Sequence, residues 1–173
     1  KKKEYEFELR FRQKNINHKK FASIFDKFTF SKSNNGFEFS YIMIKELDIY
    51  LRTDNQSKSR MTIHGDDEIK KYWLGADFDE SKITFMEKEK IENYDDDDYQ
   101  FRCSLNHELE KNNILEKNKS LLKSNNSNKY YRLKNRYRIQ TGSYFYIDLT
   151  IVKQAYGINL KESKALKTIP QYE

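Results

Sequence analysis

Charged and apolar side chains alternate along several stretches of this chain, and this alternation constrains its fold more than any other feature. In the first stretch, the ionic positions are Glu4, Glu6, Glu8, Arg10 and Arg12, and the apolar positions between them are Tyr5, Phe7, Leu9 and Phe11. Alternate side chains of a β-strand point to opposite faces of a sheet. The stretch therefore predicts a strand with one ionic and one apolar face, and we expect the apolar face to be buried.

Four further stretches segregate charge in the same way. Arg60 and Thr62 oppose Met61 and Ile63; Arg102, Ser104, Asn106 and Glu108 oppose Phe101, Cys103, Leu105 and His107; Arg132, Lys134, Arg136 and Arg138 oppose Tyr131, Leu133, Tyr137 and Ile139; Tyr144, Tyr146, Asp148 and Thr150 oppose Phe145, Ile147, Leu149 and Ile151. For any single strand, a solvated face is the ordinary interpretation. Like charges two residues apart, however, lie only about 7 Å from each other and repel. A bound ligand would offset that repulsion.

The two kinds of ionic face suit the two parts of a polyphosphate complex. Three carboxylates on one strand are hard oxygen donors for Mg²⁺ or Mn²⁺, and Arg and Lys side chains bind phosphate oxygens. A sheet of about eight strands that closes into a barrel would bring the two faces opposite each other around a small ligand. The pattern therefore predicts phosphoryl transfer, in which a metal and the cations stabilise charge while a carboxylate orients the attacking water.

The remaining sequence predicts a single, mainly β domain over residues 1–173, with helices packed outside. The expected strands are 4–12, 36–44, 46–53, 60–64, 82–91, 99–110, 129–140 and 144–153. One helix is expected over 18–28, capped by Asn17, and a weaker one over 66–74. Residues 111–128 and 155–168 are expected to be loops or irregular. The acidic run 95–98 is expected to be a solvated loop.

Composition limits the compartment and the partners. The net charge is +6 and the pI is about 9.1, although acidic residues are abundant, so a polyanionic partner is expected. Cys103 is the single cysteine, and no apolar run approaches the ~20 residues that a membrane helix needs. We expect an intracellular protein without a membrane partner. The histidines, His18, His64 and His107, lack metal-ligand spacing.

Six motifs resemble, in order, those of the triphosphate tunnel metalloenzymes. They are Glu-Phe-Glu-Leu-Arg-Phe at 6–11, Arg-Met-Thr at 60–62, Phe-Met-Glu-Lys at 85–88, Ser-Leu-Asn-His-Glu at 104–108, Arg-Leu-Lys-Asn-Arg at 132–136 and Ile-Asp-Leu-Thr at 147–150. The match at 60–62 is the least specific. Together they span most of the chain and most resemble the metal-dependent RNA triphosphatases of fungal and large-DNA-virus capping systems, with the overall character of a giant virus of the mimivirus kind.

The resemblance implies an antiparallel eight-stranded tunnel barrel that converts 5′-triphosphate RNA to 5′-diphosphate RNA, the first step of mRNA capping. It implies that Mg²⁺ or Mn²⁺ binds Glu6 and Glu8, that Glu108 positions the attacking water, and that Asp148 orients a cationic neighbour. The implied phosphate ligands are Arg60, Lys88, Arg102, Arg132, Lys134 and Arg136, of which Arg60 and Lys134 are also implied to act in catalysis. It further implies a guanylyltransferase domain downstream and, for a viral source, a place in the viral factory or virion.

Two alternatives compete with this interpretation. A related tunnel enzyme would act on free nucleoside triphosphates or inorganic polyphosphate. A non-catalytic RNA-binding β-domain would also explain the positive charge and the 25 Tyr and Phe residues (13 and 12). Against the second, we expect the aromatic side chains to lie opposite the cations, where they cannot stack on the same nucleotides.

The family's last strand also carries Glu-x-Glu-x-Glu, a motif that could begin at Glu173.

Overall fold

The computed structural model describes residues 4–11, 16–29, 41–51, 59–77, 79–110, 129–140 and 145–173. The strands are β1 (Glu4–Phe11), β2 (Tyr41–Leu51), β3 (Ser59–His64), β4 (Ile83–Asp96), β5 (Phe101–Glu110), β6 (Lys129–Gln140), β7 (Tyr146–Gly157) and β8 (Gln171–Tyr172). The helices are α1 (His18–Thr29), α2 (Asp66–Leu74) and α4 (Leu160–Ser163), with the short 3₁₀ helices η1 (Glu80–Lys82) and η3 (Ala165–Lys167). No described helix is long and apolar enough to cross a bilayer.

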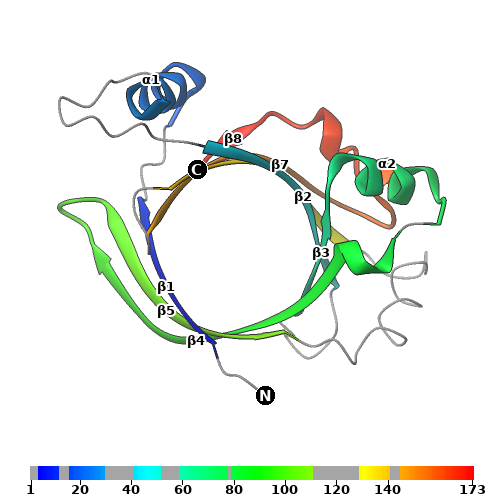
Figure 1. Cartoon of the computed structure of the whole chain (residues 1–173), viewed down its shortest axis with the longest axis horizontal. Coiled ribbons are helices and arrows are strands. Elements are labelled where there is room, and N and C mark those ends of the chain that lie inside the picture. Colours follow the sequence, from blue (N-terminus) through cyan, green and yellow to red (C-terminus); the bar gives the residue numbers. More distant parts are fainter. Residues whose placement is uncertain are drawn as a thin grey trace.

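All eight strands belong to one antiparallel sheet in the order β1-β5-β4-β3-β2-β6-β7-β8. The sheet curls into a ring around a central axis, with the helices on its outer side (Figure 1). The predicted mainly β barrel with helices packed outside is therefore confirmed. Among the described residues no ladder joins β1 to β8, which are the two edge strands.

Two apolar clusters hold the helices against the outside of the barrel. In the first, Ile69 of α2 packs with Leu47 and Ile49 of β2 and Met61 of β3. In the second, Phe21 of α1 packs with residues of β6 and β7. The predicted Asn17 cap is present, since its side chain accepts a hydrogen bond of 3.0 Å from the backbone N–H of Lys20.

The outer face of β1 is exposed, and the prediction that its apolar side is buried is wrong. Phe7 is 69% exposed, and Tyr5, Leu9 and Phe11 are also exposed. No described helix packs over β1 and β5, at the lower left of the ring in Figure 1, whereas Ile83 and Phe85 of β4 belong to the cluster that includes Ile69 of α2. Closure of the barrel encloses the ionic face, so the apolar face of β1 remains outside.

Several element boundaries differ from the prediction. The described parts of the strands expected at 36–44 and 46–53 form one strand, β2, which includes Lys45, and Lys45 pairs with Asp66 at 3.2 Å. Residues 36–40, 52 and 53 lie outside the described residues. Strand β4 runs five residues past its predicted end. A bulge between Lys90 and Glu92 interrupts the alternation there, so the sequence pattern does not show that the strand continues. Strand β7 extends to Gly157, and the expected loop 155–168 contains α4 and η3. Residues 111–128 lie outside the described residues.

Candidate active site

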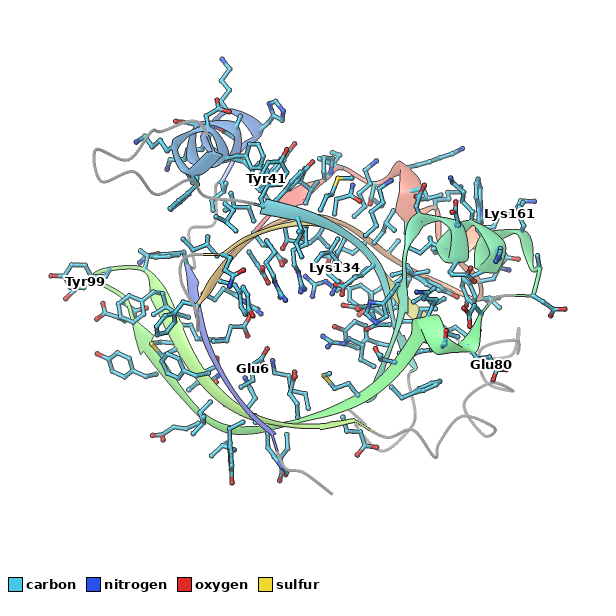
Figure 2. All side chains as sticks on the ribbon, viewed as in Figure 1. Glu6, Tyr41, Glu80, Tyr99, Lys134 and Lys161 are labelled. Carbon is cyan, nitrogen blue, oxygen red and sulfur yellow. The ribbon has the colours of Figure 1, made fainter. Side chains whose placement is uncertain are left out.

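Four strands, β2, β3, β6 and β7, form an interior wall of alternating acids and bases. In the register of the sheet, Asp48 lies between Thr62 and Arg132, and Glu46 lies between His64 and Lys134. Lys134 points toward the barrel axis in Figure 2, as its parity predicts. The predicted cations Arg132, Lys134 and Arg136 thus share one face, as alternate residues of β6 must.

Lys134 is held between two buried carboxylates. Its ammonium nitrogen lies 2.9 Å from Glu46 and 2.8 Å from Asp48, and Asp48 also accepts a 2.8 Å hydrogen bond from the Thr62 hydroxyl. Burial raises the pKa of Glu46, but His64, Lys134 and Arg136 together lower it well below its ordinary value. Glu46 is therefore ionised at neutral pH, and Glu46 and Asp48 together fix the position of the lysine.

Glu46 and Asp48 were not among the predicted site residues, although the sequence carried the signal. The segment Glu46-Leu47-Asp48-Ile49 alternates charge and apolarity just as β1 does. Its parity places both carboxylates on the interior face with Lys134, opposite the buried Leu47 and Ile49.

Three arginines on the same wall have guanidinium groups that the described residues do not fully satisfy. The Nε–H groups of Arg60, Arg132 and Arg136 are buried and have no hydrogen-bond acceptor among the described residues. A buried donor without an acceptor is costly, so such groups point to an acceptor supplied by a ligand. Arg132 also binds Glu173 through Nη2, at 2.7 and 3.0 Å.

The opposite wall, formed by β1, β5 and β4, is acidic. Lys88 of β4 forms a close ion pair with Glu6 and lies 3.7 Å from Glu8 and 3.6 Å from Glu108. Glu6 projects into the barrel interior from the wall opposite Lys134 in Figure 2. The structure thus gathers Glu6, Glu8, Lys88 and Glu108 in one cluster.

Two of the three carboxylates around Lys88, Glu8 and Glu108, have pKa values shifted in opposite directions. Burial raises the pKa of Glu8, but Arg10 and Lys88 outweigh that effect, so the net shift is downward. Burial and the negative charge of Glu6 raise the pKa of Glu108, and Lys88 and Arg60 only partly oppose this. Arg60 lies on β3, which pairs with β4, so the basic wall adjoins the acidic wall at this edge.

The donor set of the acidic wall fits a divalent cation. Mg²⁺ and Mn²⁺ are usually held by one or two carboxylates together with water and substrate phosphates, and Glu6 and Glu8 supply two. In the described part of the chain no three His, Cys, Asp or Glu side chains group as a complete metal site. The cluster does already hold a cationic group, because the Lys88 ammonium lies among its carboxylates.

Two further predicted site residues, Arg102 and Asp148, form ion pairs with neighbouring strands of the sheet. Arg102 binds Asp95 through two hydrogen bonds of 2.6 and 2.8 Å. The expectation that 95–98 is a solvated loop is therefore wrong for Asp95 and Asp96, which lie in β4. Asp148 accepts two 2.8 Å hydrogen bonds from Arg138 and lies 3.5 Å from Arg136, so it does contact cationic neighbours.

The expectation that the aromatic side chains avoid the cationic face is also wrong. The sheet register places Tyr50, Tyr130 and Tyr156 opposite one another on adjacent strands, with the same parity as Arg132 and Lys134. The sequence showed this parity within β6, where Tyr130 lies two residues before Arg132.

Solved structures of similar fold include triphosphatases of a mimivirus capping enzyme and an RNA triphosphatase of S. pombe. The mimivirus capping enzyme triphosphatase matches with a TM-score of 0.70 at 19% identity, over 97% of this chain and 78% of that one. The RNA triphosphatase domain of a trifunctional mimivirus mRNA capping enzyme gives 0.68 at 19% identity, over 97% and 76%. The S. pombe Pct1 RNA triphosphatase, in complex with the Spt5 CTD, gives 0.50 at 19% identity, over 80% and 49%. No protein-family model and no curated protein sequence matches.

Proposed function

We propose that this chain, which has the triphosphate-tunnel fold of those structures, is a metal-dependent polynucleotide 5′-triphosphatase. It converts 5′-triphosphate RNA to 5′-diphosphate RNA and phosphate, the first step of mRNA capping, as part of a protein that also carries a guanylyltransferase. The observation that carries the proposal is that the buried guanidinium Nε–H groups of Arg60, Arg132 and Arg136 have no acceptor among the described residues, in a barrel whose other wall is acidic.

The basic wall binds the phosphate chain. Arg60, Arg132 and Arg136 donate to phosphate oxygens, and guanidinium groups suit these oxygens because they donate in a fixed planar geometry. Lys134 adds a positive charge whose position Glu46 and Asp48 fix. This preorganisation stabilises charge on the transferring phosphoryl group without rearrangement during the reaction.

The acidic wall activates water and holds the metal. Glu6 and Glu8 would bind Mg²⁺ or Mn²⁺, which when bound neutralises phosphate charge. Glu108 accepts a hydrogen bond from the attacking water and takes its proton as the water oxygen bonds to the γ-phosphorus. The bond between the γ-phosphorus and its bridging oxygen breaks, and the diphosphate end leaves. Lys88, which contacts Glu108, orients that carboxylate.

Phosphate release from γ-labelled triphosphate RNA tests the proposal. The wild-type chain with Mg²⁺ or Mn²⁺ is expected to release labelled phosphate, and Glu8→Ala is expected to lower the rate at least about 100-fold, because it removes a metal ligand. Glu92→Ala is the matched control, since Glu92 is exposed on the outer face of β4. Wild-type RNA binding that survives chelation, without phosphate release, would instead favour the RNA-binding alternative.

The nearest alternative uses the same residues on a different substrate. Rates on triphosphate RNA, on a nucleoside triphosphate and on inorganic tripolyphosphate, measured with each metal, separate an RNA triphosphatase from an enzyme for free triphosphates. A higher kcat/KM for the RNA supports the proposal. A higher value for the small substrates would assign the chain to the alternative.

A further inference from the structure

Three tyrosines form a continuous aromatic row inside the barrel. The ring centroids of Tyr130 and Tyr156 are 4.6 Å apart, and those of Tyr50 and Tyr130 are 5.8 Å apart. The row lies at the end of the barrel where β2 ends, β6 begins and β7 ends, at Leu51, Lys129 and Gly157. We call Tyr50, Tyr130 and Tyr156 the tyrosine row.

The tyrosine row is not part of the apolar core. Neither hydrophobic cluster includes any of the three, and Tyr156 is 63% exposed. Large aromatic surfaces that remain accessible on a cationic face are suited to binding rather than to packing. The row therefore calls for an occupant that has a flat apolar face.

The tyrosine row adjoins the cations of the basic wall. Arg132 lies two residues after Tyr130, on the same face of β6. Tyr50 interacts with the guanidinium groups of both Arg60 and Arg132. Successive inward side chains of a strand are about 7 Å apart. A ligand that stacks on the row therefore has its neighbouring atoms within reach of these arginines.

We propose that the tyrosine row is a stacking subsite for the nucleobase next to the 5′-triphosphate. The inference rests on the proposed function, and it adds the recognition of the nucleoside. A base on Tyr156 and Tyr130 would direct its 5′-phosphates toward Arg132 and Arg60. Since every base has a π-face, the subsite tolerates all four bases while distinguishing nucleotides from inorganic polyphosphate.

A comparison of substrates with and without a nucleobase separates base stacking from a general effect on phosphate binding or on the fold. Steady-state kinetics are measured for triphosphate RNA, ATP and inorganic tripolyphosphate with wild type, Tyr156→Ala and Tyr156→Phe. In Tyr156→Ala, KM for RNA and ATP is expected to rise about 10-fold or more, since loss of one base stack weakens binding to that extent. Tripolyphosphate kinetics are expected to stay unchanged, and Tyr156→Phe is expected to restore KM because it keeps the ring.

Matched variants control for position and folding. Tyr94→Ala removes a similarly exposed tyrosine, 61% against 63%, from the outer face of β4, and is expected to change no substrate's KM. Tyr146→Ala removes the exposed tyrosine that begins β7, at the other end of that strand. Thermal unfolding of each variant shows whether a kinetic change reflects damage to the fold.

Each outcome decides the inference. An equal loss on tripolyphosphate and RNA in Tyr156→Ala would overturn it, as would a base-dependent loss in Tyr146→Ala alone. A loss for RNA and ATP supports stacking of the first base, and a loss for RNA alone would overturn it, because the stacked base would then lie further along the strand. If the wild type hydrolyses none of the three, the proposed function fails, and the Kd of triphosphate RNA for wild type and Tyr156→Ala still tests the stacking.

Discussion

The ammonium nitrogen of Lys134 lies 2.8 Å from a carboxylate oxygen of Asp48, and the two side chains are 6% and 0% exposed. Buried charges of this kind require partners, because each has lost its hydration. Lys134 has two, Asp48 and Glu46, so the basic wall contains its own acids. The stability of the basic wall therefore depends on Asp48 and Glu46, which also position Lys134 for phosphate binding.

Removing the lysine should deprive two buried carboxylates, Glu46 and Asp48, of their closest cationic partner. We expect Lys134→Met to lower the free energy of unfolding by about 3–5 kcal/mol, the usual cost of stranding a buried charge. Denaturant unfolding of wild type and variant measures the difference. Lys161→Met, at an exposed position on α4, should change the value by less than about 0.5 kcal/mol. A loss below about 1 kcal/mol for Lys134→Met would contradict a buried pair.

The contribution of Glu46 should depend on pH. Burial raises its pKa, but His64, Lys134 and Arg136 lower the folded-state pKa below the ordinary 4.5. The carboxylate therefore stabilises the fold above about pH 4.5, and this stability is lost as pH falls toward the folded-state pKa. The difference in unfolding free energy between wild type and Glu46→Gln should be larger at pH 7 than at pH 3.

Exposed Glu92 provides the comparison for this pH dependence. Glu92→Gln on the outer face should give a difference near zero at both pH values. An equal difference for Glu46→Gln at pH 7 and pH 3 would mean that Glu46 has the same pKa in the folded and unfolded states.

Much of the barrel followed from local alternation. The ends of β6 match the predicted 129–140, and the parity of Glu6 and Lys134 correctly placed both side chains in the interior. Alternation succeeds here because a strand's side-chain directions are a property of its own backbone. The helix over 18–28 likewise followed from a local cap and a local apolar spacing.

The remainder depended on tertiary structure. Alternation shows that Phe7 and Glu8 face opposite ways, but only the curling of the whole sheet determines which face is enclosed. The bulge after Lys90 shifts the parity of β4, which brings Asp95 opposite Arg102. That pairing could not be read from either strand alone, because it depends on the register between them.

The exposed outer face of β1 predicts a small loss of stability when Phe7 is truncated, whereas the sequence pattern predicted a buried ring and a large loss. Phe7→Ala should cost less than about 1 kcal/mol in unfolding free energy, because the ring is already 69% exposed. A buried Phe would cost about 3–5 kcal/mol. Ile49→Ala, at a fully buried position of β2, should cost about 2–5 kcal/mol and shows that the assay detects core damage. A large loss at Phe7 would mean that β1 is covered in solution.

Glu108 should affect turnover more than binding. It shares the acidic wall with Glu6 and Lys88, and its pKa is raised by burial and by Glu6, which makes it a stronger base than an ordinary carboxylate. Glu108→Gln keeps the shape but cannot take a proton from water, so kcat should fall about 10²- to 10⁴-fold while KM for triphosphate RNA stays within about 3-fold.

The kinetic pattern of Glu108→Gln separates its two possible roles. If Glu108 only held Lys88 in place, the variant would weaken phosphate binding and raise KM with little change in kcat, because uniform binding would be lost. Glu92→Gln should behave as wild type in the same assay. A fall in kcat with unchanged KM and unchanged thermal unfolding therefore identifies Glu108 as the group that acts on the attacking water, since no loss of substrate binding or of fold would then explain the slower reaction.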